Sequence, residues 1–167
     1  MKSFKAIGIA KSIRFLLFTP FCNLLHWVIT PQARGVLLRL AGATIGRDTM
    51  IFDAYFENVY HYGFKPLVIG SRCFIGDQVM LDVRGGITVE DDVTISQRAT
   101  VVSHMNVGYA SHPLQRAYPT KEEGVIIRSG TYIGTGAIIL PGVTVGKESV
   151  VGAGAVVTHD VPAHTVV

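Results

Sequence analysis

The chain has 167 residues, of which 49% are hydrophobic and 16% charged, so it is long enough for one domain with a sizeable core. Two cysteines, Cys22 and Cys73, are too few for a disulfide framework or a cysteine metal site; we expect Cys73 to be a packing residue, and a reducing, cytoplasmic setting fits. Residues 1–47 hold seven lysines and arginines and no acid, which favours an anionic surface such as a membrane, whereas no motif for reading nucleic acid accompanies this charge.

The N-terminal residues 3–29 are apolar with scattered basic residues. The uncharged stretch 15–29 has 15 residues and is too short to span a bilayer, which takes about 20. Pro20 predicts a break or a kink in any helix here, and residues 31–40 are a second helix candidate. We therefore predict a helical segment over 1–41. It either caps the open end of the following domain or lies peripherally in a membrane interface through residues 3–29, and these two roles are compatible.

A six-residue period organises the second predicted domain, residues 42–167. Aliphatic residues recur every six positions at Ile127, Ile133, Ile139, Val145, Val151 and Val157. An earlier ladder with the same spacing contains Ile69, Ile75, Leu81, Ile87, Val93 and Ala99, and Ile45 and Ile51 fall on its register. Such a period is typical of an all-β solenoid, a parallel β-helix in which three short strands and their corners make one triangular coil.

The two ladders are out of phase, so the chain must leave the coils between them. We predict one excursion loop over 105–126, and a loop this long without periodicity of its own is usually functional. Residues 52–64 are rich in aromatics and predict an irregular coil that either packs on the N-terminal helices or forms an aromatic wall for a sugar ring. Asp82 and Arg84 share one corner, where they form either a solvated ion pair or, through Asp82, an acceptor contact.

The segments IGTGA (133–137), ILPGV (139–143) and VGAGAVVT (151–158) resemble the hexapeptide-repeat acyltransferases, and the resemblance covers about residues 42–167. It is closer to the maltose, galactoside and polysaccharide O-acetyltransferases than to the serine O-acetyltransferases. The resemblance implies a left-handed β-helix and an enzyme that moves an acetyl group from acetyl-CoA to a hydroxyl of a sugar or polysaccharide precursor, with no metal. It also argues against reading the N-terminus as a signal peptide for export.

The resemblance places the general base on a coil edge, at the start of the protruding loop. His104, in the run Val101 to His104, occupies that place, and histidine suits proton removal near neutral pH. His112, inside the loop, is the rival base and otherwise a residue that contacts the acceptor. Asp82 is the second candidate for acceptor binding, because its position precedes His104 by two coil faces.

The resemblance also implies a homotrimer with acetyl-CoA bound between subunits. The residues that match the donor-binding corners are Gly134, Thr135, Gly136, Ala153, Gly154, Thr158 and His159. Relatives carry a basic residue where this chain has His159, so Arg128 or Lys147 would supply contacts to the CoA phosphates. Relatives also continue past Thr158 with a Gly-x-Pro-Ala segment, whereas this chain ends at Val167, so the sequence is either truncated or has an uncapped last coil.

Three alternatives remain beside the sugar O-acetyltransferase. A serine O-acetyltransferase is disfavoured because the long helical N-terminal domain of those enzymes is missing. A γ-type carbonic anhydrase needs His-x4-His on a coil, and only His159 and His164 have that spacing, without a third histidine nearby. A non-catalytic scaffold would keep the fold and use its sides for partners, although it would not need His104 or the long loop.

Overall fold

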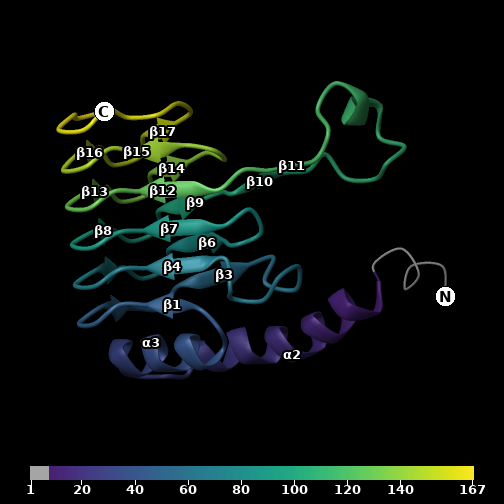
Figure 1. Ribbon diagram of the computed structural model, residues 1–167, viewed down its shortest axis with the longest axis horizontal. Helices are drawn as coiled ribbons and strands as arrows, with labels where there is room; N and C mark the ends of the chain where they lie inside the picture. The colour runs from purple at the N-terminus through teal and green to yellow at the C-terminus, as the bar shows by residue number, and fades with distance from the viewer. Residues whose placement is uncertain (1–7) are drawn as a thin grey trace.

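The computed structural model describes residues 8–167, which form a three-sided parallel β-helix standing on two helices (Figure 1). Each side is a five-stranded parallel sheet whose strands come from successive coils. Sheet A contains β1 (Thr44–Ile45), β4 (Leu67–Ile69), β7 (Ile87–Val89), β12 (Val125–Ile127) and β15 (Thr144–Val145). Sheet B contains β2 (Met50–Ile51), β5 (Phe74–Ile75), β8 (Thr94–Ile95), β13 (Tyr132–Ile133) and β16 (Val150–Val151). Sheet C contains β3 (Tyr55–Glu57), β6 (Met80–Asp82), β9 (Thr100–Val101), β14 (Ile138–Ile139) and β17 (Val156–Val157).

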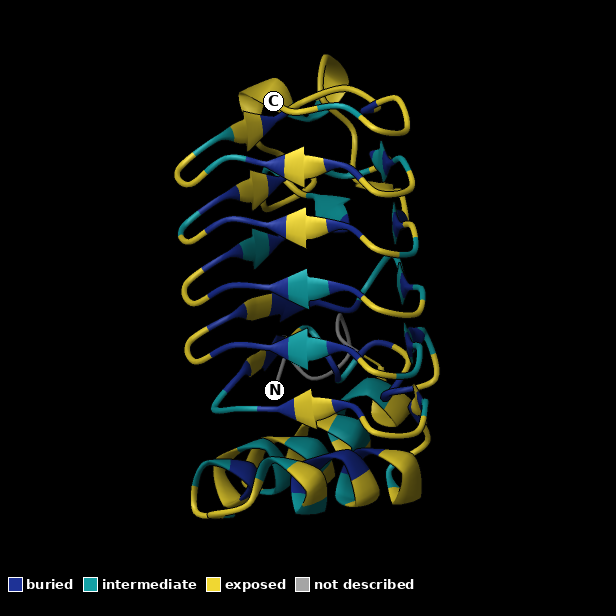
Figure 2. Cartoon of the chain, turned by 90° about the vertical axis from the view of Figure 1, so that its left-hand side faces the viewer, coloured by how far each residue is buried: buried dark blue, intermediate teal, exposed yellow. Residues whose placement is uncertain are grey.

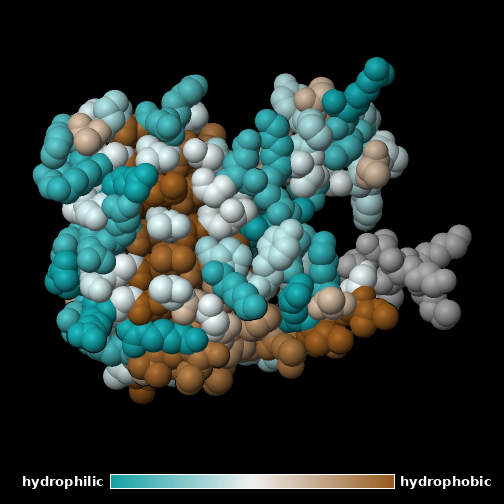
Figure 3. All heavy atoms as spheres, in the orientation of Figure 1, coloured by the Kyte–Doolittle hydropathy of each residue, from teal (hydrophilic) through white to brown (hydrophobic). Residues whose placement is uncertain are grey.

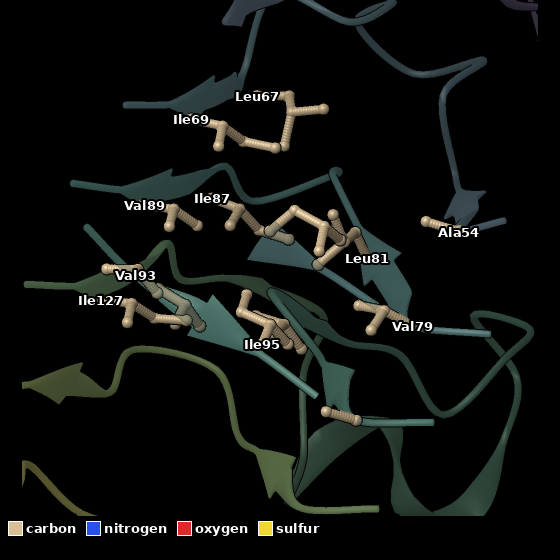
Figure 4. Packing of buried hydrophobic residues seen from close by; sticks show 14 of the residues in the cluster. Ala54, Leu67, Ile69, Val79, Leu81, Ile87, Val89, Val93, Ile95 and Ile127 are labelled. Atoms are coloured by element: carbon tan, nitrogen blue, oxygen red, sulfur yellow. The ribbon is translucent and has the colours of Figure 1, made fainter. Parts of the chain in front are cut away.

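The core is one apolar column along the axis of the prism. Each short strand turns one aliphatic side chain inward and its neighbour outward, which gives the alternating burial visible along every coil in Figure 2. Figure 4 shows how Leu81, Val89, Ile95 and Ile127, from different coils, meet in the same interior. Because every coil buries such residues against the next, the stacked coils form one continuous core.

The later ladder of six aliphatic residues is confirmed, because all six are buried and they fall in turn on sheets A, B and C. The earlier ladder is confirmed in part: all its residues are buried and its register holds up to Leu81, but it is wrong from Ile87 onward. In sheet A the partner of Ile69 is Val89 and not Ile87, and in sheet C the partner of Leu81 is Val101. Two extra residues in the turn after β6 cause the shift. The six-residue spacing did not reveal it because each unit buries a second apolar residue two positions earlier.

All the lengthened connections lie at one corner, between sheet C and the next strand of sheet A; we call it the C–A corner. They are the segments 58–66, 83–86 and 102–124. The longest forms an arm in which β10 (His104–Met105) pairs antiparallel with β11 (Lys121–Glu122) and a 3-10 turn, η1 (Pro113–Arg116), lies at the far end (Figure 1). The coil resumes at Val125, two residues earlier than predicted.

Two helices lie across the base of the prism. α2 (Ile9–His26) runs through Pro20 without a break, contrary to one of the two predicted outcomes. Pro20 is exposed, so the carbonyl group that loses its hydrogen bond can be solvated. α3 (Pro31–Leu40) begins with proline at its first turn and packs on β1 and β2. No helix in residues 8–167 is both long and apolar enough to cross a membrane.

The inner side of α2 caps the column, and the aromatic segment completes the cap. The rings of Phe18 and Phe21 lie 5.5 and 5.6 Å from that of Phe64, which is fully buried and also meets Phe56. The prediction that the aromatic segment packs against the N-terminal helices is therefore confirmed. Residues 3–7 of the predicted membrane segment lie outside the described residues.

Candidate active site

His104 and Asp82 meet at the C–A corner, one coil apart. His104 opens the arm just after β9, and Asp82 ends β6, the strand to which β9 is paired. The His104 Nδ1 atom lies 2.5 Å from the Asp82 Oδ2 atom. The His104 side chain keeps 18% of its surface exposed, whereas that of Asp82 keeps 5%. The pair thus presents the imidazole to solvent and holds the carboxylate inside.

The Asp82 carboxylate is fully engaged. Its Oδ2 atom also accepts a hydrogen bond from the Ser103 backbone N–H at 2.9 Å, and its Oδ1 atom accepts one from the Asn58 amide at 2.9 Å. Burial acts to raise the pKa of Asp82, but the hydrogen bonds from His104, Ser103 and Asn58 outweigh it and the net pKa is lowered. Asp82 therefore stays ionised at neutral pH and little of its surface is left for an acceptor.

This pairing fixes the tautomer of the neutral His104 ring. An ionised carboxylate only accepts hydrogen bonds, so the proton of neutral His104 lies on Nδ1 and the lone pair lies on Nε2. The Nε2 atom can then take a proton, and the carboxylate stabilises the positive charge that results. This is the arrangement that a general base requires.

Ser103 locks the two turns together. Its buried hydroxyl donates to the Asp82 carbonyl at 2.5 Å and accepts from the Gly85 N–H at 2.7 Å. A Cβ atom at Gly85 would lie 1.9 Å from the Ser103 carbonyl oxygen, so only glycine fits where these coils approach. The backbone that carries His104 is thereby fixed to the turn that follows Asp82.

A second polar cluster fastens the arm. The expected ion pair between Asp82 and Arg84 does not form; instead the Arg84 Nε atom donates to Glu122 at 2.8 Å. The Tyr62 hydroxyl donates to the other oxygen of Glu122 at 3.0 Å. The hydrogen bond from Arg84 lowers the pKa of Glu122. Because Glu122 lies directly opposite His104 in the ribbon, this cluster holds the start of the arm next to the imidazole.

A cavity of about 270 Å³ opens between α2 and β3, beside the same corner. Its wall includes aromatic rings from Phe15, Tyr55 and Tyr60, and its polar groups include those of Glu57 and Asn58. Asn58 connects the cavity to the catalytic candidates, because its amide nitrogen is the one that donates to Asp82. The cavity thus combines aromatic faces with hydrogen-bonding groups.

Five of the predicted donor-binding residues lie together at the opposite edge of sheet C, where sheet B meets sheet C. Gly154 stacks on the Thr135 turn, with its N–H donating to the Thr135 carbonyl at 2.9 Å. Gly136 and Gly154 have positive φ values and open space where a side chain would begin, which suits close approach of a ligand. Gly134 serves stacking instead, because its Cβ would lie 2.5 Å from the Ala153 nitrogen.

Thr158 and His159 lie elsewhere, after β17 at the C–A corner. Both are exposed, and the Thr158 hydroxyl lies 2.8 Å from the His159 Nδ1 atom. The two cations expected to replace a basic residue at His159 are already paired, Arg128 with Glu90 at 2.6 Å and Lys147 with Glu148 at 3.1 Å. Within one chain, the predicted donor residues therefore flank sheet C from two corners.

The rival base lies apart from this site. His112 precedes η1 at the far end of the arm, is exposed, and accepts a hydrogen bond from the Leu114 N–H at 3.2 Å. The structure does not bring it to His104 within one chain (Figure 1). In residues 8–167 there is no group of three or more His, Cys, Asp or Glu side chains that could hold a metal ion.

Sequence reasoning missed four residues that this geometry brings forward: Asn58, Ser103, Glu122 and Arg98. The first three orient His104 or its partner, and Arg98 shares a shallow groove with Thr135. Ser103, adjacent to His104, is the only one with a local signal. The others become neighbours through coil stacking, which depends on the length of each turn.

Comparison with known families supports this reading of the repeats. Residues 124–159 match the family described as "Bacterial transferase hexapeptide (six repeats)", and residues 66–96 match "Hexapeptide repeat of succinyl-transferase". The putative colanic acid biosynthesis acetyltransferase WcaF of Escherichia coli K12 is 32% identical over 133 residues, covering 80% of this chain and 68% of the relative. The galactoside O-acetyltransferase of Lactococcus lactis is 28% identical over 144 residues, covering 83% of this chain and 65% of the relative.

Solved structures show the same architecture. A hexapeptide-repeat acetyltransferase of Vibrio cholerae, complexed with acetyl coenzyme A, superposes with a TM-score of 0.76 at 24% identity and covers 89% of this chain and 78% of that one. A galactoside acetyltransferase in complex with coenzyme A has a TM-score of 0.70 at 21% identity, and the match covers 96% of this chain and 78% of that one. The predicted left-handed β-helix is confirmed.

The chain spans about two thirds of the length of its first curated relatives, 65% and 68%. The matched region includes both regular blocks of coils. The repeats and the fold agree, and the chain is 32% identical to a relative of which it covers 68%. The chain therefore belongs to the hexapeptide-repeat acyltransferase family.

Proposed function

We propose that the protein is an acetyl-CoA-dependent O-acetyltransferase whose acceptor is a hydroxyl of a sugar or polysaccharide precursor. The observation that carries this proposal is the hydrogen bond between His104 and the buried, ionised Asp82. It leaves the Nε2 atom of a partly exposed imidazole as a base at the edge of the site. The WcaF and galactoside O-acetyltransferase relatives support the choice of chemistry and of acceptor class.

In the proposed reaction, His104 Nε2 removes the proton of the acceptor hydroxyl. The hydroxyl oxygen forms a bond to the thioester carbonyl carbon of acetyl-CoA, the carbon–sulfur bond breaks, and the proton is returned to the sulfur as free CoA leaves. A positioned base contributes roughly 10²–10⁴-fold to the rate. Asp82 holds the imidazole in the required tautomer and stabilises its charge, as a positioning residue rather than one that touches the substrate.

The acceptor binds in the cavity between α2 and β3. Its aromatic faces suit the apolar face of a sugar ring, and Glu57, Asn58 and Asn23 offer partners for hydroxyl groups. Asn58 links this cavity to Asp82, which supports delivery of one hydroxyl to His104. Serine is the second acceptor candidate, because serine acetyltransferases are also among the relatives, one of them 32% identical over 124 residues.

The donor binds between subunits of a homotrimer. Sheet C carries an outward column of side chains between the two corners that hold the candidate residues. Four of the five are exposed and apolar, Tyr55, Met80, Ile138 and Val156, and Thr100 lies between Met80 and Ile138. A second prism packed on this face would bury the column and bring its own residues to both corners. The open backbone at Gly136 and Gly154 supports donor binding there. Acetyl-CoA use and two free cysteines fit a cytoplasmic location.

The test is CoA release from acetyl-CoA with a panel of sugars, nucleotide sugars, lipid-linked sugars and serine. We expect turnover with a sugar acceptor and at least a hundredfold loss of kcat in His104→Ala. His112→Ala, the matched histidine variant on the arm, should keep its kcat. The assignment of the base is overturned if His112→Ala loses activity and His104→Ala does not. A protein that binds no CoA and turns over no acceptor is a scaffold instead.

A further inference from the structure

The outer side of α2 is as apolar as the side that packs on the prism. At helical spacing along its length, the residues that face away from the core are Ile9, Ile13, Leu16, Leu17, Pro20, Leu24 and Trp27, and we call them the outer stripe. Leu16 is 71% exposed and Trp27 84%. Figure 3 shows this apolar surface as a continuous band along the base of the molecule.

The stripe extends past the end of α2. Ile29, in the connection to α3, is 93% exposed, and Leu40, at the end of α3, is 80% exposed. Soluble proteins seldom leave large apolar side chains together in such numbers unless a partner covers them.

The segment of the chain that carries the stripe has positive charges and no negative ones. Residues 8–47 contain Lys11, Arg14, Arg34, Arg39 and Arg47 and no acid, and in residues 8–167 none of these five forms an ion pair. Arg14, Arg34 and Arg39 donate only to backbone carbonyls, so their charges are not neutralised. Two copies joined through this face would bring like charges together, whereas an anionic surface would compensate them.

We propose that the outer stripe docks the protein on an anionic lipid surface, with α2 lying in the plane of the membrane interface. An amphipathic contact of this kind buries an apolar helix face at the boundary of headgroups and acyl chains, and its strength adds apolar burial to attraction by anionic lipid. Trp27, at the C-terminal end of α2, is the residue type favoured at such a boundary. The inference does not depend on the proposed acetyl transfer.

Trp27 is the single tryptophan of the chain, so its emission reports contact directly and needs no label. We would titrate the full-length protein with vesicles of phosphatidylcholine alone and of phosphatidylcholine mixed with phosphatidylglycerol. The expected result is a blue shift and binding that is stronger with phosphatidylglycerol and weaker at high salt. No shift with either vesicle, or equal binding to both, would overturn the proposal.

Leu16→Glu tests the stripe without touching the core or the cavity. We expect its partition coefficient to fall at least tenfold, because losing the burial of a leucine exceeds the free energy of a tenfold change. Val166→Glu, the same change at a 76% exposed residue near the other end of the prism, should bind like the wild type. Thermal unfolding must match in both variants. If Leu16→Glu binds lipid as well as the wild type does, the proposal is overturned. If the wild type binds no lipid and Leu16→Glu has a smaller mass in sedimentation, the stripe is a protein contact instead.

Discussion

The Asp82 carboxylate determines what the His104 ring can do. Replacing it with asparagine keeps the size of the side chain but removes the charge that holds the Nδ1 proton and stabilises the protonated ring. For Asp82→Asn we expect kcat to fall roughly 10²–10⁴-fold while the KM for acetyl-CoA changes little. The acidic limb of the kcat–pH profile should also move to lower pH. Steady-state kinetics across pH measure both effects.

Asp92→Asn is the matched control for that substitution, because Asp92 is exposed and pairs with Arg72 on another corner. Its kinetics should equal those of the wild type. If both variants behave alike, or if Asp82→Asn changes only the melting temperature, then Asp82 has a structural role and not a positioning one. The shape of the pH profile separates these cases.

His61 is a buried histidine that the proposed reaction does not use. Burial, with added repulsion from Arg84 and Lys11, lowers the pKa of His61 to about 4 from 6.5. Between these two values the unfolded chain binds a proton that the folded protein rejects, so the free energy of unfolding should decline as the pH falls from 6.5 to about 4. The decline is about 1–3 kcal/mol.

His61→Phe should remove that part of the pH dependence, since phenylalanine does not titrate and fits among the neighbouring rings of Tyr60 and Tyr62. Urea unfolding followed over this pH range, for the wild type and the variant, measures the difference between the two stability curves. Parallel curves would show that His61 titrates normally in the folded protein.

At the scale of single residues, the sequence predicted His104 but not its partner. His104 has a local context, the end of a ladder and the start of a long loop. The link to Asp82 depends on the number of residues in the turn between β6 and β7, and the hexapeptide period alone did not reveal the two extra residues there. From the sequence alone Asp82 is therefore a candidate for acceptor binding, whereas in the structure its carboxylate is bonded to the imidazole.

The corners of the coils use glycine for two different reasons. At Gly134 an added methyl group would meet backbone 2.5 Å away, whereas at Gly154 it would meet nothing but would have to adopt a φ of +72°. Gly134→Ala should therefore cost more, about 1–3 kcal/mol from overpacking, and Gly154→Ala about 1–2 kcal/mol from the left-handed conformation.

The urea midpoints of these two variants test the distinction. Because the added methyl group at Gly134 would clash with the backbone of the next coil, the whole turn must shift to remove the clash. We expect Gly134→Ala also to weaken donor binding indirectly, by moving the Thr135 turn. An equal loss of stability in both variants would mean that the coils relax freely at this edge.

At the scale of elements, periodicity predicted most of the strands because each coil repeats the same burial pattern. It placed the six units from Ile127 to Val157 correctly. It did not place β10 and β11, since a two-residue ribbon has no period to detect. The break predicted at Pro20 does not occur, because on an exposed helix face the carbonyl group that loses its hydrogen bond can be solvated.

The whole molecule combines a regular prism with irregularity at its base and at one corner. The apolar composition of residues 3–29 predicted both a cap and a membrane contact. The structure shows the cap for residues from 8 onward, through Phe18 and Phe64. The sequence alone did not show that one apolar side of α2 is covered and the opposite apolar side stays exposed, because this depends on where the prism packs.

Because all long connections lie at the C–A corner, their length and sequence can change with little effect on the stability of the coils. A longer connection there adds little free energy of loop closure, about 0.6 kcal/mol for each doubling of its length, and leaves the strand pairing of the three sheets unchanged. The same corner holds His104, Asp82 and part of the wall of the cavity. If the proposed function holds, new acceptor preferences can arise by exchanging the segments 58–66 and 102–124, while the coils and the proposed donor residues at the opposite edge of sheet C stay unchanged.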